Sequence, residues 1–284
     1  MKTSTSTFNP ASERVRSGAV HTIDWAPDGA AVADLVLVHG YAEHSARYEP
    51  VARRLTAAGL RVASLDLPGH GRSAGPKGVV EDFEGLVDVV AQYVDEVHGD
   101  RPLFLYGHSM GGLAVVRLAE RDDSAFAGMV IASAALAAAG SIPAPLVAMA
   151  NVLGRLAPRL PTIVLDGTAI SRDHDVRADY EHDPLNYRGR MSAGTGRQLS
   201  VAMAAAHSDA ARITRPVLIL HGEADRLTAP DGSERLFREV SSADKTLRTW
   251  PGAFHELHHE PERDEVLDVV VSWIDEHLRP TVPD

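Results

Sequence analysis

Six short apolar runs recur along this 284-residue chain, and each leads into a loop rich in glycine or polar residues. Longer stretches with helical spacing of apolar residues separate them. This alternation is typical of an α/β protein with a mostly parallel central sheet flanked by helices. The runs are LVLVHG, RVASLDLPGHG, PLFLYGHS, FAGMVIAS, PVLILHGEAD and TLRTWPGAFH, which begin at residues 35, 61, 102, 126, 216 and 246. Helices are predicted from Tyr48 to Gly59, with Gly59 as the stop signal, and from about Phe83 to Val97.

From Ala134 to Arg212 the alternation breaks, because prolines, glycines and small residues dominate and no run has the character of a core strand. We therefore predict a core formed by residues 1–133 and 213–284, with residues 134–212 inserted as a cap, or lid. Apolar residues at helical spacing predict a helix within the insertion. They are Ile142, Leu146, Met149, Leu153 and Leu156. This helix could pack on the core or cover an apolar pocket, and a cap helix can do both.

Composition excludes several classes of function. The net charge is -11 and the basic residues are scattered, so nucleic acid is not an expected partner. There is no cysteine, which removes disulfides, thiolate catalysis and cysteine-based metal sites. The N-terminal segment lacks the apolar core of a secretory signal, and the uncharged stretch from Ser124 to Gly154 is interrupted by proline and glycine. We expect a cytoplasmic enzyme whose cap can contact membranes or lipid aggregates.

The most specific motif is Gly107-His108-Ser109-Met110-Gly111, which follows a buried-type strand and precedes a predicted helix. A G-x-S-x-G sequence in this strand–turn–helix context is the nucleophile elbow. The turn is so tight that only glycine fits two positions to either side of the serine. Ser109 would then lie at a helix N-terminus, where backbone N–H groups favour a developing negative charge.

A serine hydroxyl needs a general base, and that base needs a carboxylate that fixes its tautomer. In this fold the chain order is serine, acid, histidine. Asp225 ends the run PVLILHGEAD, whereas its rivals Asp209 and Asp231 end no apolar run. Among later histidines, His255 lies in a loop after a strand-like run. The others that satisfy the order are His258, His259 and His277.

The oxyanion hole needs two backbone N–H donors. One belongs to the residue after the nucleophile, and the second must come from another loop. His39-Gly40-Tyr41 follows the first core run, so we assign the oxyanion hole to the N–H groups of Tyr41 and Met110. Five further histidines flank strands or turns without the spacing of a zinc motif, and we interpret them as structural. They are His39, His44, His70, His108 and His221. No metal or cofactor is expected.

With these residues placed, the chain resembles the monoacylglycerol lipases of the bacterial, mycobacterial type, within the α/β-hydrolases. The resemblance covers most of the chain, and its match in the cap is the most informative part, because caps vary with substrate. The matching segments are HGYAEHSARY, LDLPGHGRSAG, YGHSMGG, TAISRDHDVRADYEHDPLNY, LHGEADRLT and PGAFHELHHEPER.

This resemblance implies that Glu43, Arg47 and His258 surround the glycerol end of the substrate. An equally weighted alternative is that Glu43 and Arg47 form an internal ion pair that props the oxyanion loop. Relatives often carry glycine in place of Ala42, and alanine there costs about 1 kcal/mol if the residue needs a positive φ. The acyl chain would lie in the apolar cap, with Leu146 and Leu153 among its contacts.

The expected reaction is hydrolysis of a monoacylglycerol to fatty acid and glycerol through an acyl-enzyme on Ser109. The same three residues also serve carboxylesterases, lysophospholipases, aminopeptidases and perhydrolases. A ligand-binding protein of this fold without turnover is the non-enzymatic alternative.

Overall fold

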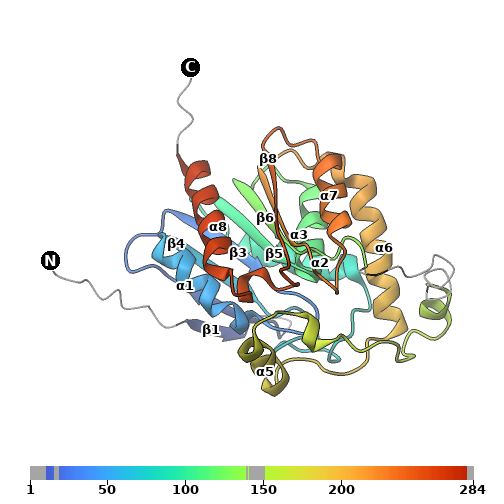
Figure 1. The fold of residues 1–284 in the computed structure, drawn as a ribbon. Coiled ribbons are helices and arrows are strands. Elements are labelled where there is room, and N and C mark those ends of the chain that lie inside the picture. The colour runs from blue at the N-terminus through green and yellow to red at the C-terminus, as the bar shows by residue number, and fades with distance from the viewer. Residues whose placement is uncertain (1–10, 16–18, 139, 141–150, 280–284) are drawn as a thin grey trace.

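The computed structural model describes residues 11–15, 19–138, 140 and 151–279 (Figure 1). One eight-stranded sheet with the order β1-β2-β4-β3-β5-β6-β7-β8 forms its centre. Strands β3 to β8 run parallel, and β2 pairs antiparallel with both β1 and β4. The strands are β1 Ser12–Val15, β2 His21–Trp25, β3 Ala33–Val38, β4 Leu60–Leu65, β5 Leu103–His108, β6 Gly128–Ala132, β7 Val217–Gly222 and β8 Lys245–Trp250.

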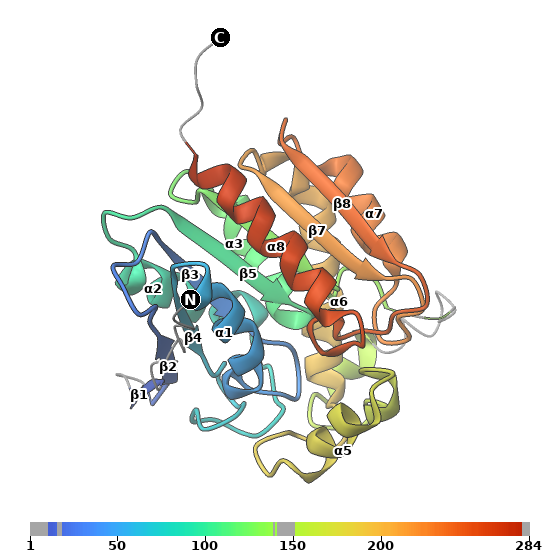
Figure 2. The ribbon, with the colours of Figure 1, turned by 60° about the vertical axis from the view of Figure 1, so that its left-hand side comes forward.

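All six predicted runs are strands of this sheet, which confirms the predicted fold class. Helices cover both faces, with α1 and α8 on one and α2, α3 and α7 on the other (Figure 2). They are α1 Glu49–Ala57, α2 Phe83–Val97, α3 Met110–Arg121, α5 His174–His182, α6 Ala193–Asp209, α7 Pro230–Glu239 and α8 Arg263–Leu278. Short 3₁₀ turns are η1 Ser45–Tyr48, η2 Gly167–Ala169, η3 Ala210–Arg212 and η4 Leu257–His259.

The helices expected from Tyr48 to Gly59 and from Phe83 to Val97 form at these places. Helix α2 spans Phe83–Val97 and buries a stripe of apolar residues at three- and four-residue spacing, while the carboxylate of Asp82 caps its N-terminus. Helix α1 ends at Ala57, and Gly59 follows with a φ of 89°. That left-handed conformation is favourable for glycine, which is why the chain can turn there into β4.

Residues 134–212 lie between β6 and β7. Within their described part the only β contacts are two isolated bridges, so the segment adds no strand to the sheet. Helix α6 packs on α2 and α3, whereas α5 lies away from the sheet at one end of the molecule (Figure 1). Of the predicted apolar helix, residues 151–156 are helical and positions 142, 146 and 149 lie outside the described residues. No helix among the described residues is long and apolar enough to cross a membrane.

The parallel strands bring the loops that follow their C-terminal ends to one edge of the sheet. The loops after β3, β5, β7 and β8 therefore meet there. They carry Tyr41, Ser109, Asp225 and His255 respectively.

Candidate active site

Ser109 occupies a strained turn between β5 and α3, with φ 53° and ψ -118°. A β-carbon on Gly107 would lie 2.6 Å from the carbonyl oxygen of Gly111, and one on Gly111 would lie 2.2 Å from that of Val38. Only glycine fits at either position, as the motif predicted. The strain is typical of a functional site, since a non-glycine residue with positive φ persists only where its surroundings enforce it.

His255 and Asp225 are in direct contact. Nδ1 of His255 lies 2.7 Å from Oδ2 of Asp225, and both side chains are buried. The backbone N–H groups of Leu227 and Thr228 donate to Oδ1 of Asp225 at 2.8 and 3.0 Å, and the hydroxyl of Thr228 donates to Oδ2 at 2.8 Å. The carboxylate is thus fixed on both oxygens, which leaves Oδ2 facing the imidazole.

This pairing polarises both groups. Burial alone would lower the pKa of His255, but the carboxylate of Asp225 outweighs it and raises that pKa above its usual 6.5. Burial would raise the pKa of Asp225, but the imidazoles of His255 and His221 and their hydrogen bonds hold it well below its usual range. An ionised aspartate beside a histidine with a raised pKa is the arrangement that a general base needs.

The loop after β3 lies against the serine. A β-carbon on Gly40 would lie 3.0 Å from that of Ser109, and the N–H of Gly40 donates to Oε1 of Glu43 at 2.6 Å. The hydroxyl of Tyr41 donates to the carbonyl of Gly78 at 2.7 Å. Ala42 has a φ of 67°, so the condition under which alanine is strained at this position is met.

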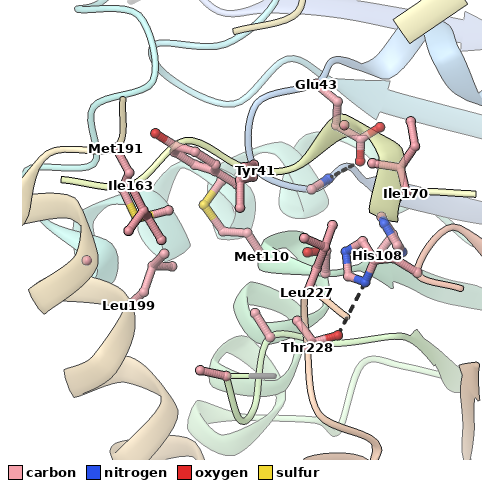
Figure 3. A pocket seen from close by; sticks show the side chains of 18 of the residues that line it. Tyr41, Glu43, His108, Met110, Ile163, Ile170, Met191, Leu199, Leu227 and Thr228 are labelled. Atoms are coloured by element: carbon pink, nitrogen blue, oxygen red, sulfur yellow. Dashed lines mark hydrogen bonds between the residues drawn. The ribbon is translucent and has the colours of Figure 1, made fainter. Parts of the chain in front are cut away.

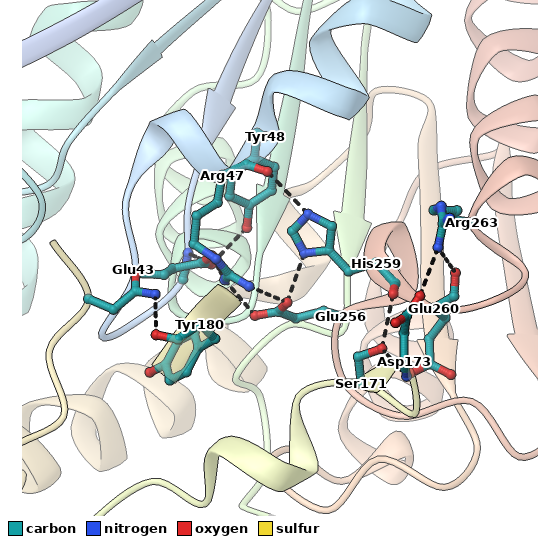
Figure 4. A network of polar contacts seen from close by, with 12 residues as sticks. Glu43, Arg47, Tyr48, Ser171, Asp173, Tyr180, Glu256, His259, Glu260 and Arg263 are labelled. Atoms are coloured by element: carbon teal, nitrogen blue, oxygen red, sulfur yellow. Dashed lines mark hydrogen bonds and ion pairs between the residues drawn. The ribbon is translucent and has the colours of Figure 1, made fainter. Parts of the chain in front are cut away.

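Behind this loop lies a buried network of charges (Figure 4). Arg47 donates to Oε2 of Glu43 at 2.5 Å and to both carboxylate oxygens of Glu256 at 2.7 Å. Nδ1 of His259 contacts Glu256 at 2.8 Å, and the hydroxyl of Tyr48 donates to Glu43 at 2.8 Å. Burial alone would raise the pKa of both carboxyl groups, but the guanidinium lowers it for each.

The network corrects part of the expected glycerol site. Glu43 borders the central cavity, whereas Arg47 and His258 are not among its lining residues. His258 is fully buried, and its ring stacks on Tyr48 with centroids 4.7 Å apart. Arg47 forms the ion pair that was the alternative interpretation. Sequence reasoning missed Glu256, which follows His255 directly and does border the cavity.

The cavity measures about 520 Å³ and has two chemically different ends (Figure 3). Ser109, His255, Glu43 and Glu256 lie at the polar end. The other end is apolar, and in Figure 3 Ile163, Met191 and Leu199 gather there, with Met110 and Tyr41 between the two ends. Further apolar lining residues are Leu165, Ile170, Met203 and Leu227.

Of the predicted acyl contacts, Leu153 is partly buried but is not among the lining residues of this cavity, and Leu146 lies outside the described residues. Much of the apolar lining comes instead from residues 162–170, Met191 and helix α6. No signal in the sequence separated these residues from ordinary core residues.

Two groups of side chains within the described residues bring metal-type ligand atoms within 4.8 Å of one another. They are Glu256 with His258 and His259, and Glu43 with His108 and Glu256. Arg47 already contacts both carboxylates, and its guanidinium would repel a second cation at this distance. We therefore assign these carboxylates to the ion network.

Comparison with known proteins agrees with this geometry. The serine aminopeptidase S33 family matches residues 29–262. The monoacylglycerol lipase of Mycolicibacterium smegmatis is 42% identical over 261 residues, which cover 89% of this chain and 92% of that protein. The human monoglyceride lipase is 38% identical over 88% of this chain and 84% of its own length.

Among solved structures, the monoacylglycerol lipase of Paleococcus ferrophilus has a TM-score of 0.83 at 37% identity, covering 91% of this chain and 99% of that one. A soluble variant of the Saccharomyces cerevisiae monoglyceride lipase, in complex with a substrate analogue, also has a TM-score of 0.83, at 25% identity and 98% coverage of both chains. These matches span the core as well as the inserted segment. The chain therefore belongs to the monoacylglycerol lipase family of serine hydrolases, within the α/β-hydrolase superfamily.

Proposed function

We propose that this protein hydrolyses monoacylglycerols to free fatty acid and glycerol. The observation that carries the proposal is the cavity at Ser109, which is polar beside the serine and apolar over the rest of its length. An ester with one long chain and a small polar alcohol matches both ends. The names of the relatives support the same substrate class.

In the proposed reaction, Oγ of Ser109 attacks the ester carbonyl carbon while Nε2 of His255 takes its proton. The N–H groups of Tyr41 and Met110 stabilise the resulting oxyanion, and each such donor contributes about 3 kcal/mol. His255 then passes the proton to the departing glycerol oxygen, which leaves an acyl-enzyme. A water activated by the same imidazole releases the fatty acid, and Ser109 regains its proton.

We assign the glycerol hydroxyls to the carboxylate oxygens of Glu43 and Glu256, because both residues border the cavity beside Ser109. Arg47 supports both carboxylates from behind through its ion pairs, and His258 packs on Tyr48, which donates to Glu43. Acyl burial contributes about 0.8 kcal/mol per CH₂, but that contribution is the same for a glyceryl and a methyl ester. Preference for the alcohol must therefore come from hydrogen bonds between the glycerol hydroxyls and polar groups of the site, and losing such bonds costs about 1–3 kcal/mol.

The test of this assignment compares kcat/KM for a monoacylglycerol, the matching methyl ester and the triacylglycerol. We expect at least a tenfold preference for the monoacylglycerol over the methyl ester, and a smaller preference in Glu43→Gln. Both esters react in the same variant. A general loss of activity caused by a disturbed oxyanion loop therefore cancels in the ratio of their kcat/KM values. Equal rates on both esters in the wild type would leave only a general esterase or lysophospholipase.

Chemistry at Ser109 is tested separately. Ser109→Ala and His255→Ala are each expected to reduce kcat about a millionfold, and Asp225→Asn about ten-thousandfold, because the three residues act as one unit. A fluorophosphonate should label the wild type at Ser109. Absence of labelling together with absence of ester hydrolysis would favour a ligand-binding protein.

Residues 134–212 form the cap in this proposal. Residues 151–165 of this segment, which we call the cap tip, supply a surface for lipid. Large apolar side chains are exposed close together in the sequence there, at 79% for Leu156, 58% for Ile163 and 53% for Val164. Ile163 also borders the cavity, so the surface continues into the acyl end. Exposed apolar patches of this kind mark interaction sites. Leu156→Asp should slow hydrolysis of a long-chain substrate in vesicles and leave a short soluble ester unaffected.

A further inference from the structure

Asp225 has a second imidazole beside it. His221 lies at the C-terminal end of β7 and is fully buried. Its Nε2 lies 3.2 Å from Oδ2 of Asp225, the same oxygen that His255 contacts. The expected mechanism gives His221 no task, although it touches the carboxylate on which the base depends.

The contacts of His221 fix which ring nitrogen carries its proton. Besides the carboxylate, Nε2 lies 3.3 Å from the carbonyl oxygen of Thr228, and both of these atoms can only accept. Nδ1 lies 2.7 Å from Oγ of Ser233 on helix α7, a hydroxyl that is itself buried. Nε2 therefore carries a proton and donates toward Asp225 and Thr228, while Nδ1 pairs with the hydroxyl of Ser233, which fixes the orientation of the ring.

This arrangement completes the environment of the carboxylate. Backbone N–H groups of Leu227 and Thr228 hold Oδ1, while Oδ2 accepts from the hydroxyl of Thr228 and lies between His255 and His221. A carboxylate with donors on one oxygen alone could turn about its χ2 angle and lose the bond to His255. The hydroxyl of Thr228 and the imidazole of His221 both oppose that rotation from their contacts with Oδ2.

We propose that His221, oriented by Ser233, is a positioning residue that keeps Oδ2 of Asp225 aimed at Nδ1 of His255 throughout acyl transfer. The inference rests on the proposed function of the Ser109 site and adds two residues to it. His255 is already faced by His108 from β5, whose pKa burial lowers to about 4, and by the carboxylates of Glu43 and Glu256.

The test uses four variants and a short soluble ester, so that neither the cap nor glycerol recognition enters. His221→Leu removes the donor, His221→Gln keeps an N–H at a similar reach, and Ser233→Ala frees the tautomer. His277→Leu, on α8 and away from the site, is the matched control. We expect kcat of His221→Leu to fall about tenfold to a hundredfold with KM little changed, as for the loss of a hydrogen bond to a charged group.

His221→Gln should retain most of the wild-type kcat. In Ser233→Ala the kcat should fall less than it does in His221→Leu. The downfield proton resonance of Nδ1–H of His255 should broaden or shift in His221→Leu and remain in His277→Leu. Wild-type kcat in His221→Leu would overturn the proposal, as would equal losses of kcat and melting temperature in the leucine and glutamine variants. If His221→Leu does not fold, the glutamine and Ser233→Ala variants decide between these outcomes.

Fluorophosphonate labelling of wild-type Ser109 separates the two proposals. Absence of labelling and of ester turnover in the wild type would remove the proposed function itself. Normal labelling and turnover with an unchanged His221→Leu would remove only the role of His221.

Discussion

Alanine at position 42 adopts a backbone conformation that costs an L-residue about 1–2 kcal/mol. Its methyl group is also buried, and losing a buried methyl costs about 0.8 kcal/mol. These two effects oppose each other in Ala42→Gly, so we expect the free energy of unfolding to rise by no more than about 1 kcal/mol. Ala52 is a buried helical position of α1. In Ala52→Gly the lost methyl group and the poor helix propensity of glycine both destabilise the fold, and together they should lower the free energy of unfolding by about 1–2 kcal/mol. Urea unfolding of both variants measures the difference, and equal costs would contradict strain at Ala42.

The base His255 determines the pH dependence of turnover. It accepts the serine proton only when neutral, so kcat/KM on a soluble ester should rise with pH as His255 loses its proton. Because Asp225 raises the pKa of His255 against the effect of burial, the midpoint should lie above the usual 6.5. In Asp225→Asn burial acts without the carboxylate, and the midpoint should fall below that value. The pH profile of fluorophosphonate labelling at Ser109 measures both midpoints, and an unchanged midpoint in Asp225→Asn would contradict the assigned pair.

Individual residues differ in how far the sequence specifies their surroundings. Ser109, Asp225 and His255 could be placed because each follows a strand, and parallel strands deliver such residues to one edge of the sheet. The contacts of Arg47 with Glu256 and the stacking of His258 on Tyr48 could not be predicted, because residue spacing does not tell which way a side chain points. The pairing of His221 with Ser233 joins a strand to a helix that the sequence did not reveal.

At the scale of elements, long regular patterns were predictable and short or weak ones were not. Helix α2 formed as predicted because seven of its residues lie on one buried stripe. Helix α7 was missed, since Leu236 is its only large buried apolar residue and the helix begins at a proline after a polar loop. Strands β1 and β2 were also missed. They are short and run antiparallel at the edge of the sheet, outside the alternation of strands and helices that identified the core.

Helix α6 contains a glycine whose removal should strengthen it. A β-carbon on Gly196 would have only Sδ of Met191 nearby, at 3.8 Å, while one on Gly194 would lie 3.0 Å from both Cβ and the carbonyl oxygen of Pro158. Alanine is more favourable than glycine inside a helix by about 1 kcal/mol. We expect Gly196→Ala to raise the free energy of unfolding by about 0.5–1 kcal/mol. Gly194→Ala should leave it unchanged or lower it. Denaturant unfolding checks the pair, and a destabilised Gly196→Ala would show that the space beside α6 is already filled.

For the molecule as a whole, charge and shape together determine how it can meet a lipid surface. The net charge of -11 repels an anionic bilayer from most directions. The cap tip differs, because residues 151–165 contain two arginines and no acidic residue, and exposed apolar side chains lie among them. Arg155 and Arg159 are both exposed. The molecule should therefore approach such a surface with its cap first, which also brings the acyl end of the cavity toward the lipid.

Arg155→Gln combined with Arg159→Gln tests this orientation. Each arginine near an anionic surface contributes about 1 kcal/mol, so the pair should account for about a tenfold to thirtyfold change in binding to vesicles that contain phosphatidylserine. Hydrolysis of a monoacylglycerol in those vesicles should fall by a similar factor, and the loss should shrink as salt is raised because the attraction is screened. Arg14→Gln with Arg248→Gln removes the same charge from exposed positions on β1 and β8 and should have little effect. A short soluble ester reports the intact active site in both double variants. Equal losses in the two pairs would mean that net charge alone, and not the cap tip, governs the encounter with lipid.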